Sequence, residues 1–466
     1  MAPQPLTGWR DGASLAGRLG DLDPETAASK AALFAAAAER LIAAGVPETA
    51  QARGFLVPGR IEVLGKHTDY AGGRSLLVAT SKGFAVLAVD REDEQCRVIT
   101  LEPGVADPEV TIPFDTVEEQ AGGHWSNYPR TAIRRLGRNF PGLKGADIAI
   151  GCDLPPASGM STSSALICSI FVVLDARNGI RGRKELEGVS EETLYEYLGC
   201  IENGQSCGDL VGDKGVGTFG GSEDHTAIMA CKRQVVHLFS FCPTRLEQSI
   251  PFPCTWAFVV ASSGVIADKT GTKLHDYNRA ALLGRKACEV AAAALALPQP
   301  TTLAACVRAA GDDPLGRIRG FLAEAAAGDL GTGGGAYEAE DLVRRFEQFY
   351  HESERIIPGV AEALLAAGDG ARLGELVAES QRRSDEGLKN IVEETRWLPA
   401  EAAKLGSLAA SAFGAGFGGS VWAIVDHSDA IRFRDAWRDA YTREFPQWRT
   451  TCEFFIMTPG DSVAEL

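Results

Sequence analysis

The residues best suited to chemistry form a hydroxyl-rich segment in the middle of the chain. Residues 155–166 (PPASGMSTSSAL) open with two prolines, which stop any preceding strand or helix, and then carry a glycine and four consecutive hydroxyl residues. An apolar run of buried-helix length follows, and residues 146–150 before the segment alternate as a strand does. The pattern predicts a strand, a loop of small residues and a helix.

A loop of this kind is suited to phosphate binding. The first turn of a helix offers unpaired backbone N–H groups and a partial positive charge, and small residues let the backbone approach an anion closely. A serine in the loop can also reach a phosphate-bound magnesium ion. The alternative is a hydroxyl cap on a buried core helix, which is a common feature, and the segment by itself fits both interpretations.

A second polar cluster lies near the N-terminus, between two strand-like runs. Within residues 54–73, glycines flank a cation, an imidazole and a carboxylate. The polar residues of this cluster are Arg60, Lys66, His67, Asp69 and Tyr70. Such a loop is typical of polar-ligand recognition, and the alternative is a charged hairpin tip with solvated side chains.

Three further residues have side chains that could take part in catalysis or in ligand binding. Glu202 lies on a charged helix expected over residues 191–204, and Asp224 lies at the start of a short apolar helix. Asp224 is either a catalytic carboxylate or a charge that stabilises a helix N-terminus. Trp125, just before a basic helix, either stacks on a planar base or packs in a core, and packing is the more common role of a lone tryptophan.

Near the C-terminus, residues 413–425 hold a glycine-rich match, with Gly414, Gly416 and Gly419 in GxGxxG spacing. A dinucleotide-binding fingerprint needs a strand before it and a helix after it. Here we expect a helix before and a strand after, so the order is reversed. The sequence also has no GxxxxGK[ST] segment, which excludes a Walker-type site.

Composition narrows the class of protein. The chain has 466 residues, 45% of them apolar, and a formal charge of −16 with a pI near 5.0, which argues against nucleic acid or an anionic membrane as the main partner. Its 11 cysteines are scattered without zinc-ligand spacing, as reduced thiols of a cytoplasmic protein are. We find neither a signal-peptide core nor an apolar run long enough for a membrane span.

The helices and strands that must position these residues are expected to follow one another in no regular order. We expect two short helices over residues 24–52, interrupted at Gly45, a polar insertion at 205–221 and a flexible glycine-rich loop at 328–335. Strands are expected at 76–88, within 89–115 and at 258–265, and helices at 130–138, 276–296, 340–356, 359–367, 371–386 and 398–412. Clustered strands without regular βαβα alternation favour an α+β fold.

Taken in order, the three motif segments resemble the GHMP small-molecule kinase superfamily, and within it the galactokinase branch. Residues 59–70 (GRIEVLGKHTDY) are similar to the galactokinase signature, which is highly specific. Residues 156–165 resemble the ATP phosphate loop of the family, and residues 414–419 its C-terminal glycine motif. The resemblance spans nearly the whole chain.

The resemblance implies a two-lobed α+β architecture with the active site between the lobes. Residues 1–250 would form an N-terminal lobe like domain 2 of ribosomal protein S5, and residues 251–466 a ferredoxin-like C-terminal lobe. It also implies a cytoplasmic sugar kinase that uses ATP and Mg²⁺ to phosphorylate the C1 hydroxyl of galactose or a close relative. Nucleic-acid and membrane partners are not expected, and the protein would be a monomer or a dimer.

The same resemblance implies roles for individual residues. Arg60 would offset charge on the transferring phosphoryl group, and Asp224 would approach the anomeric hydroxyl as a base or an orienting acceptor. The residues implied for sugar binding are Lys66, His67, Asp69 and Tyr277. The residues implied for nucleotide binding are Gly159, Ser161, Thr162, Ser163 and Ser164, with Trp125 beside the adenine. Ser163 and Glu202 would coordinate magnesium.

One departure from the family concerns the sugar. Galactokinases carry a glutamate, which accepts a hydrogen bond from a sugar hydroxyl, where this chain has Lys66. A lysine only donates and suits an anion, so a uronic acid such as galacturonate is an alternative substrate unless Lys66 points elsewhere. A second departure is the stretch between Glu202 and Asp224, which is longer than expected of the family. It affects which position of the family motif Glu202 matches.

Two other functions fit the resemblance less well. A catalytically silent sugar sensor would lose part of the hydroxyl-rich loop or a catalytic residue, whereas this chain keeps residues 161–165, Arg60 and Asp224. A kinase of the mevalonate or homoserine type would not carry the His-Thr-Asp-Tyr portion at residues 67–70.

Overall fold

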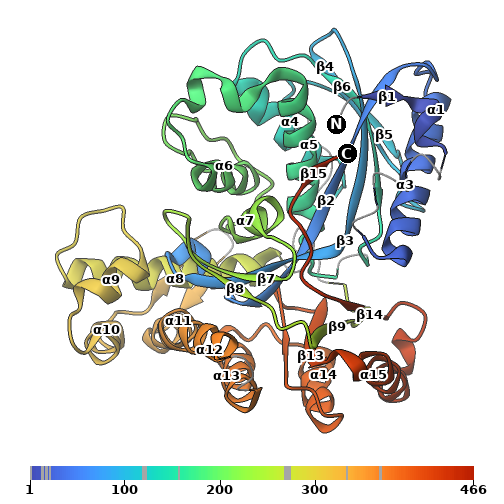
Figure 1. Ribbon diagram of the computed structural model, residues 1–466. Helices are drawn as coiled ribbons and strands as arrows, with labels where there is room; N and C mark the ends of the chain where they lie inside the picture. Colours follow the sequence, from blue (N-terminus) through green and yellow to red (C-terminus); the bar gives the residue numbers. More distant parts are fainter. Residues whose placement is uncertain are drawn as a thin grey trace.

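The computed structural model describes residues 3–11, 15, 19, 22–117, 123–155, 158–266, 274–331, 334–366 and 370–466. Two sheets organise the chain, a nine-stranded sheet and a four-stranded antiparallel sheet, with helices packed on both (Figure 1). The mixed helix and sheet content confirms the α+β class.

The larger sheet forms the N-terminal lobe around two long strands, β2 (Gln51–Leu64) and β3 (Arg74–Asp90). Its main path runs β1-β2-β3-β6-β4-β5, and β4 and β6 are its parallel pair. The other strands on this path are β1 (Gln4–Pro5), β4 (Gln95–Thr100), β5 (Glu109–Pro113) and β6 (Ala146–Cys152). β7 (Val235–Ser240) pairs with the start of β3, β8 (Arg245–Pro251) with β7, and β15 (Ala464–Glu465) with β2.

Helices cover both faces of this sheet (Figure 1). One face carries α3 (Pro24–Ala43), with the short α1 (Leu6–Trp9) beside it. The other carries α4 (Asn127–Asn139), α5 (Thr162–Asn178), α6 (Glu191–Asn203) and α7 (Glu223–Ala230). Two 3₁₀ turns, η2 (Ile180–Gly182) and η3 (Lys184–Leu186), join α5 to α6.

The predicted pair of helices over residues 24–52 is wrong, because the segment forms one helix. Pro24 begins α3, and the side chain of Asp23 accepts the N–H of Thr26 at 3.0 Å as a cap. Gly45 has a φ of +88° and lies in the turn after the helix. β2 then starts at Gln51, because pairing with β3 takes those residues into the sheet.

The hydroxyl-rich segment leads into α5, as predicted. From Ser164 to Leu174 every residue of this helix is buried, so it packs on all sides in the N-terminal core. The strand before it, β6, is also buried along six of its seven residues. The strand–loop–helix unit therefore has rigid elements at both ends.

The smaller sheet belongs to the C-terminal lobe and has the strand order β12-β13-β9-β14. Its strands are β9 (Trp256–Ser262), β12 (Ala409–Ala412), β13 (Ser420–Asp426) and β14 (Glu453–Met457). Helices α14 (Glu393–Lys404) and α15 (Ala430–Glu444) pack on it, with short turns η6 (His427–Asp429) and η7 (Pro446–Trp448) at the ends of α15.

The predicted helix over residues 398–412 is wrong in its second half. α14 ends at Lys404, and residues 409–412 form β12, which pairs with β13. Alanine favours a helix by propensity, but the tertiary pairing overrides that weak preference. The glycine-rich segment therefore joins two antiparallel strands, with no helix directly before it.

The remaining helices follow β9 in the sequence and precede α14 and β12. They are α8 (Leu274–Ala294), α9 (Leu303–Ala309), α10 (Pro314–Ala323), α11 (Ala339–His351), α12 (Ile357–Leu365) and α13 (Gly370–Arg383). π-helical turns η4 (Glu352–Ile356) and η5 (Ser384–Leu388) extend α11 and α13, and η1 (Asp69–Ala71) is a 3₁₀ turn between β2 and β3. The strand β10 (Gly328–Asp329), at the start of the predicted glycine-rich loop, pairs with β11 (Ala336–Tyr337), which directly follows that loop; residues 332–333 of the loop lie outside the described part.

None of the helices in the described part of the chain is both long enough and apolar enough to cross a membrane. The C-terminal residues do not stay in the second lobe, because β15 returns to the sheet of the first lobe (Figure 1). The division at residue 250 stays a prediction.

Candidate active site

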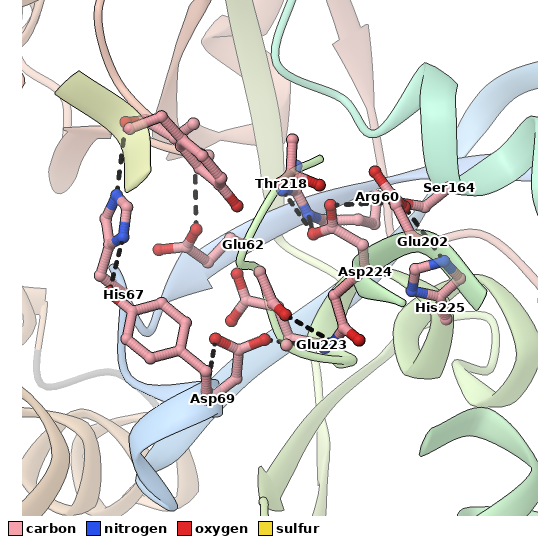
Figure 2. A pocket seen from close by; sticks show the side chains of 17 residues that line it. Arg60, Glu62, His67, Asp69, Ser164, Glu202, Thr218, Glu223, Asp224 and His225 are labelled. Carbon is pink, nitrogen blue, oxygen red and sulfur yellow. Dashed lines mark hydrogen bonds and ion pairs between the residues drawn. The ribbon is translucent and has the colours of Figure 1, made fainter. Parts of the chain in front are cut away.

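The described residues surround a pocket where the loop after β2, the starts of α5 and α7 and the glycine-rich segment meet. Figure 2 shows its side chains, with His67 and Asp69 on one side and Glu202 and His225 on the other. Its acidic lining residues are Glu62, Asp69, Glu202, Glu223 and Asp224. The sequence thus folds residues from distant segments around one cavity.

Arg60 and Asp224 form the closest ion pair in the pocket. The guanidinium of Arg60 lies 2.6 Å from Oδ1 of Asp224, and its side chain is 1% exposed. Arg60 also donates to the carbonyl of Gly159 at 2.5 Å, which links this pair to the hydroxyl-rich loop. A buried arginine held in this way presents fixed positive charge beside a carboxylate.

Glu62 follows Arg60 on the same face of β2, because side chains alternate along a strand. Its side chain is buried, and one oxygen, Oε2, accepts the N–H of Gly414 at 3.2 Å. Burial raises the pKa of Glu62 to about 7, although Lys66 and Arg60 oppose this shift. The sequence analysis missed this residue, and the spacing of two from Arg60 was the signal that could have found it.

The turn after β2 places two of the predicted sugar-binding residues, His67 and Asp69, at the pocket. His67 adopts a φ of +59°, and its ring Nδ1 lies 2.9 Å from the hydroxyl of Tyr70. Asp69 accepts the backbone N–H groups of Tyr70 at 2.8 Å and of Glu223 at 3.2 Å. Tyr277, in the first turn of α8, lies with its ring 5.6 Å from that of His67 and completes this side.

Lys66 is not among the described residues that line the pocket, and its role as a sugar-binding residue stays a prediction. Its Nζ donates to the hydroxyls of Ser411 at 3.0 Å and Ser380 at 3.1 Å, and the side chain is 1% exposed and does not line the pocket. Gly65, at a φ of +133°, precedes it in the turn. The lysine is therefore a buried donor to the C-terminal lobe.

The hydroxyl-rich loop keeps unsatisfied polar atoms. Ser161 sits at the N-cap of α5 with a φ of +59° and Gly159 has a φ of +74°, so the backbone turns sharply before the helix. Among the described residues, the hydroxyls of Ser158 and Ser161 are buried without a hydrogen-bond partner. Together with the free N–H groups of the first turn of α5, at Thr162 to Ser164, they form donors suited to an anion. Pro156 and Ala157 of the predicted motif lie outside the described residues.

The glycine-rich segment packs directly on this loop. A Cβ on Gly414 would lie 2.9 Å from the carbonyl oxygen of Gly159, and one on Gly419 would lie 3.1 Å from that of Ser158. The hydroxyl of Ser420 donates to the carbonyl of Ser158 at 2.7 Å. The first residue of β13 thus fixes the backbone of the hydroxyl-rich loop.

Glu202 joins the loop to the pocket. Its Oε1 accepts from the hydroxyl of Ser163 at 3.2 Å and its Oε2 from that of Ser164 at 2.8 Å. The Nε2 of His225, a buried residue missed as part of the site, lies 3.2 Å from the same carboxylate. The alignment of Glu202 with the loop serines is therefore compatible with the preceding insertion.

The donor set at Ser163 and Glu202 fits magnesium. Mg²⁺ prefers oxygen ligands and usually takes one or two protein groups, with waters and substrate phosphates completing its shell. A hydroxyl and a carboxylate 3.2 Å apart beside an anion-binding loop provide such a partial set. Within the described ranges, no cluster of three or more His, Cys, Asp and Glu side chains is placed to hold a metal.

Trp125 lies at the edge of the N-terminal core. Its indole N–H donates to the carbonyl of Asp107 at 3.3 Å, and the half-buried ring packs against the core on which α4 and α5 lie. It does not line the pocket. Its role beside an adenine stays a prediction.

The polar insertion at residues 205–221 forms part of the pocket wall, which the sequence analysis missed. Thr218, Gly220 and Gly221 line the cavity together with Glu223 from the start of α7. A Cβ on Gly221 would lie 2.2 Å from Oδ2 of Asp69, so a glycine is needed for this close approach. The number of glycines in the insertion was the available signal.

Three family profiles match the chain. The galactokinase galactose-binding signature matches residues 48–89, the GHMP kinases N terminal domain residues 127–220, and the GHMP kinases C terminal domain residues 360–443. These ranges contain Arg60 to Tyr70, the hydroxyl-rich loop and the glycine-rich segment, respectively.

Several curated proteins are similar over most of their length. A galactokinase of Chloroflexus aggregans is 29% identical over 392 residues, which cover 84% of this chain and 87% of that protein. A galactokinase of Pasteurella multocida is 24% identical over 415 residues, which cover 87% of this chain and 93% of that protein.

Solved structures share the fold. The galactokinase of Lactococcus lactis, complexed with galactose, superposes with a TM-score of 0.73 at 22% identity, over 92% of this chain and 98% of that one. The L. major mevalonate kinase, in complex with R-mevalonate, gives a TM-score of 0.51 at 14% identity, over 87% of this chain and 96% of that one. The two-lobed architecture is therefore that of these kinases.

Proposed function

The chain belongs to the GHMP kinase superfamily and is galactokinase-like within it, and from this premise we propose that it transfers the γ-phosphoryl group of ATP to the C1 hydroxyl of galactose. The observation that carries the proposal is the buried Arg60–Asp224 pair, which lies between the pocket and the hydroxyl-rich loop. Phosphoryl transfer to a hydroxyl needs a carboxylate beside the hydroxyl and a cation beside the phosphoryl group, and this pair provides both.

Asp224 accepts the proton of the C1 hydroxyl as the new O–P bond forms and the bond to ADP breaks. Arg60, fixed on Asp224 and on the carbonyl of Gly159, offsets negative charge on the transferring phosphoryl group. Phosphoryl transfer asks the protein mainly for positioning and charge neutralisation, and both side chains are positioned before a substrate arrives.

The nucleotide phosphates bind at the hydroxyl-rich loop. The N–H groups at the start of α5 donate to phosphate oxygens, as does the hydroxyl of Ser161, which has no partner among the residues that the structure describes. Gly159 lets the backbone approach the phosphates. Thr162, Ser163 and Ser164 form the first turn of the helix at this point. Ser163 and Glu202 would hold Mg²⁺, which supplies charge neutralisation to the phosphates when it is bound.

The sugar occupies the side of the pocket formed by His67, Asp69 and Tyr277. The curated relatives are galactokinases, which favours galactose. The donation of Lys66 to Ser380 and Ser411, away from the described lining of the pocket, also favours galactose over galacturonate. The cytoplasmic location, the absence of nucleic-acid and membrane partners, and the choice between monomer and dimer stay predictions.

An ADP-release assay with Mg²⁺ and ATP tests the proposal. The substrates are galactose, galacturonate, glucuronate, arabinose and fucose, and the Asp224→Ala variant is the inactive control. Turnover of galactose that is lost in this variant is the expected result. Absence of turnover on every sugar, with ATP still bound in calorimetry, would contradict the proposal and favour a non-catalytic sugar sensor.

A further inference from the structure

Glu62 has an oxygen that nothing in the described part of the protein occupies. Its Oε2 accepts the N–H of Gly414, whereas its Oε1 is buried and has no hydrogen-bond partner among the described residues. The side chain is 1% exposed and lines the pocket (Figure 2). A buried carboxylate oxygen without a donor is costly, so a donor that arrives with a ligand would be bound strongly.

The other carboxylates of the pocket already have protein partners. Asp69 accepts two backbone N–H groups, and Glu223 accepts the hydroxyl of Ser75 at 2.7 Å. Asp224 is paired with Arg60, and Glu202 accepts from Ser163 and Ser164. Glu62 is therefore the acidic residue of the pocket with a buried oxygen that has no hydrogen-bond partner among the described residues.

The charge around Glu62 decides what kind of group it can accept. Five carboxyl groups line the pocket (Glu62, Asp69, Glu202, Glu223 and Asp224), and Arg60 is the one arginine or lysine among the described residues that line it. Burial and the repulsion from Glu62 raise the pKa of Glu223, which shows how crowded the negative charge is. A carboxylate on the sugar would add a further negative charge, whereas a hydroxyl would donate to Glu62 without this cost.

We infer that Glu62 is the specificity-determining residue of the sugar site, where its free oxygen accepts a hydrogen bond from a substrate hydroxyl and excludes sugars that carry a carboxylate. This inference rests on the proposed sugar kinase activity and adds to it the chemistry by which the substrate is chosen. Lys66 acts on Glu62 through its charge, while its ammonium group donates to Ser380 and Ser411 and the lysine is not among the described residues that line the pocket.

The test compares galactose with galacturonate in the wild type and in the Glu62→Gln variant at pH 8. Glutamine keeps the shape and the acceptor for Gly414, but it removes the charge and replaces one oxygen with a donor. We expect the ratio of kcat/KM for galactose over galacturonate to fall by about ten-fold or more in the variant, as for loss of a hydrogen bond to a charged group. An unchanged ratio would overturn the inference.

Glu352→Gln is the matched control. Glu352 is equally buried, has one oxygen without a partner among the described residues, and does not line the pocket. Its other oxygen accepts from Gly65 and from Ser380, both at 3.0 Å, and glutamine keeps that acceptor. We expect the ratio to stay at the wild-type value, and an equal fall in both variants would overturn the inference in favour of a general effect of charge removal.

A second measurement separates this inference from the proposed function. Calorimetric binding of galactose and galacturonate, without ATP turnover, is compared between the wild type and the Glu62→Gln variant. If the wild type binds galactose but turns over neither sugar, the kinase proposal fails, while loss of the preference for galactose in Glu62→Gln still supports the role of Glu62. If both proteins bind the two sugars with the same relative affinity, the role of Glu62 fails even where turnover is observed.

Discussion

Arg60 and Asp224 lie 164 positions apart in the sequence, and their side chains meet with a separation of 2.6 Å. The pair connects β2 to the first turn of α7 and, through the carbonyl of Gly159, to the hydroxyl-rich loop. Each member compensates the charge of the other in a buried place. The pair therefore has a structural and a catalytic task, and the two can be separated by experiment.

Asp224→Asn should separate these tasks. We expect kcat to fall by about a hundred- to ten-thousand-fold, because the amide cannot accept the sugar proton. The free energy of unfolding should fall by about 3 kcal/mol, because the buried guanidinium of Arg60 loses its compensating charge. Steady-state kinetics and urea denaturation measure the two effects. Asp209→Asn, an exposed position in the 205–221 segment, is the control, and retained kcat in Asp224→Asn would contradict the catalytic role.

Gly414→Ala should weaken nucleotide binding. The residue has a φ of +76°, and a Cβ there would lie 2.9 Å from the carbonyl oxygen of Gly159 in the hydroxyl-rich loop. We expect the KM for ATP to rise by about ten-fold, since a small misplacement of a binding loop has effects of this order or larger.

Gly406→Ala is the matched control for this change. Gly406 has a φ of +93°, and a Cβ there would meet nothing within 4 Å. Both variants carry the same backbone strain of about 1 kcal/mol, which thermal unfolding reports, but Gly406→Ala should leave the KM for ATP unchanged. Equal values of KM in the two variants would show that the contact with Gly159 does not matter for ATP.

Glu202→Gln should increase the magnesium requirement. The carboxylate contacts Ser163, Ser164 and His225, so its replacement by an amide removes the charged oxygen of the site. We expect the Mg²⁺ concentration for half-maximal rate to rise by about ten-fold or more, and the affinity for Mg²⁺ with a non-hydrolysable nucleotide to fall in parallel. Glu191→Gln, exposed at the start of the same helix, should change neither quantity. A normal magnesium dependence in Glu202→Gln would rule out its role as a ligand.

Glu62 should make the stability of the protein depend on pH. Its pKa rises from 4.5 to about 7 on folding because of burial, so the folded protein binds more protons than the unfolded chain between these values. The contribution of Glu62 to stability is therefore fully present below pH 4.5 and decreases as the pH rises through 7, by up to about 3 kcal/mol.

Glu62→Gln removes this contribution. The difference between the melting temperatures of the variant and the wild type should therefore be larger at pH 8 than at pH 5, in favour of the variant. Thermal unfolding at several pH values, without ligands, measures it. A constant difference across this range would show that Glu62 does not titrate there.

Much of the site could be expected from the sequence because it lies in contiguous motifs. Residues 146–150, the loop and α5 form a local strand–loop–helix unit, and the local pattern was enough to predict them. The approach of Arg60 to Asp224 could be expected from the resemblance, since no local pattern joins positions so far apart.

The features that could not be expected from the sequence have tertiary causes. The direction of Lys66 depends on two serines, 314 and 345 positions away, and the residue type alone suggests only that it donates. The strand β12 was predicted as helix because its alanines favour a helix locally, whereas pairing with β13 decides the outcome. The spacing of Glu62 from Arg60 indicates only that the two share a face of β2, whereas the buried oxygen of Glu62 without a partner among the described residues is a property of the folded pocket.

The return of the chain to its first sheet has a consequence for folding during synthesis. β15 pairs with residues Phe55 and Leu56 of β2, and the N–H of Leu466 donates to the carbonyl of Gly54 at 2.9 Å. A ribosome releases β2 long before it releases residues 464–466. Until then, this part of the strand edge has no partner and is open to pairing with other chains, as unprotected edges are. The nascent first lobe therefore cannot close this edge by itself, and chaperones would protect it from aggregation until residues 464–466 are synthesised.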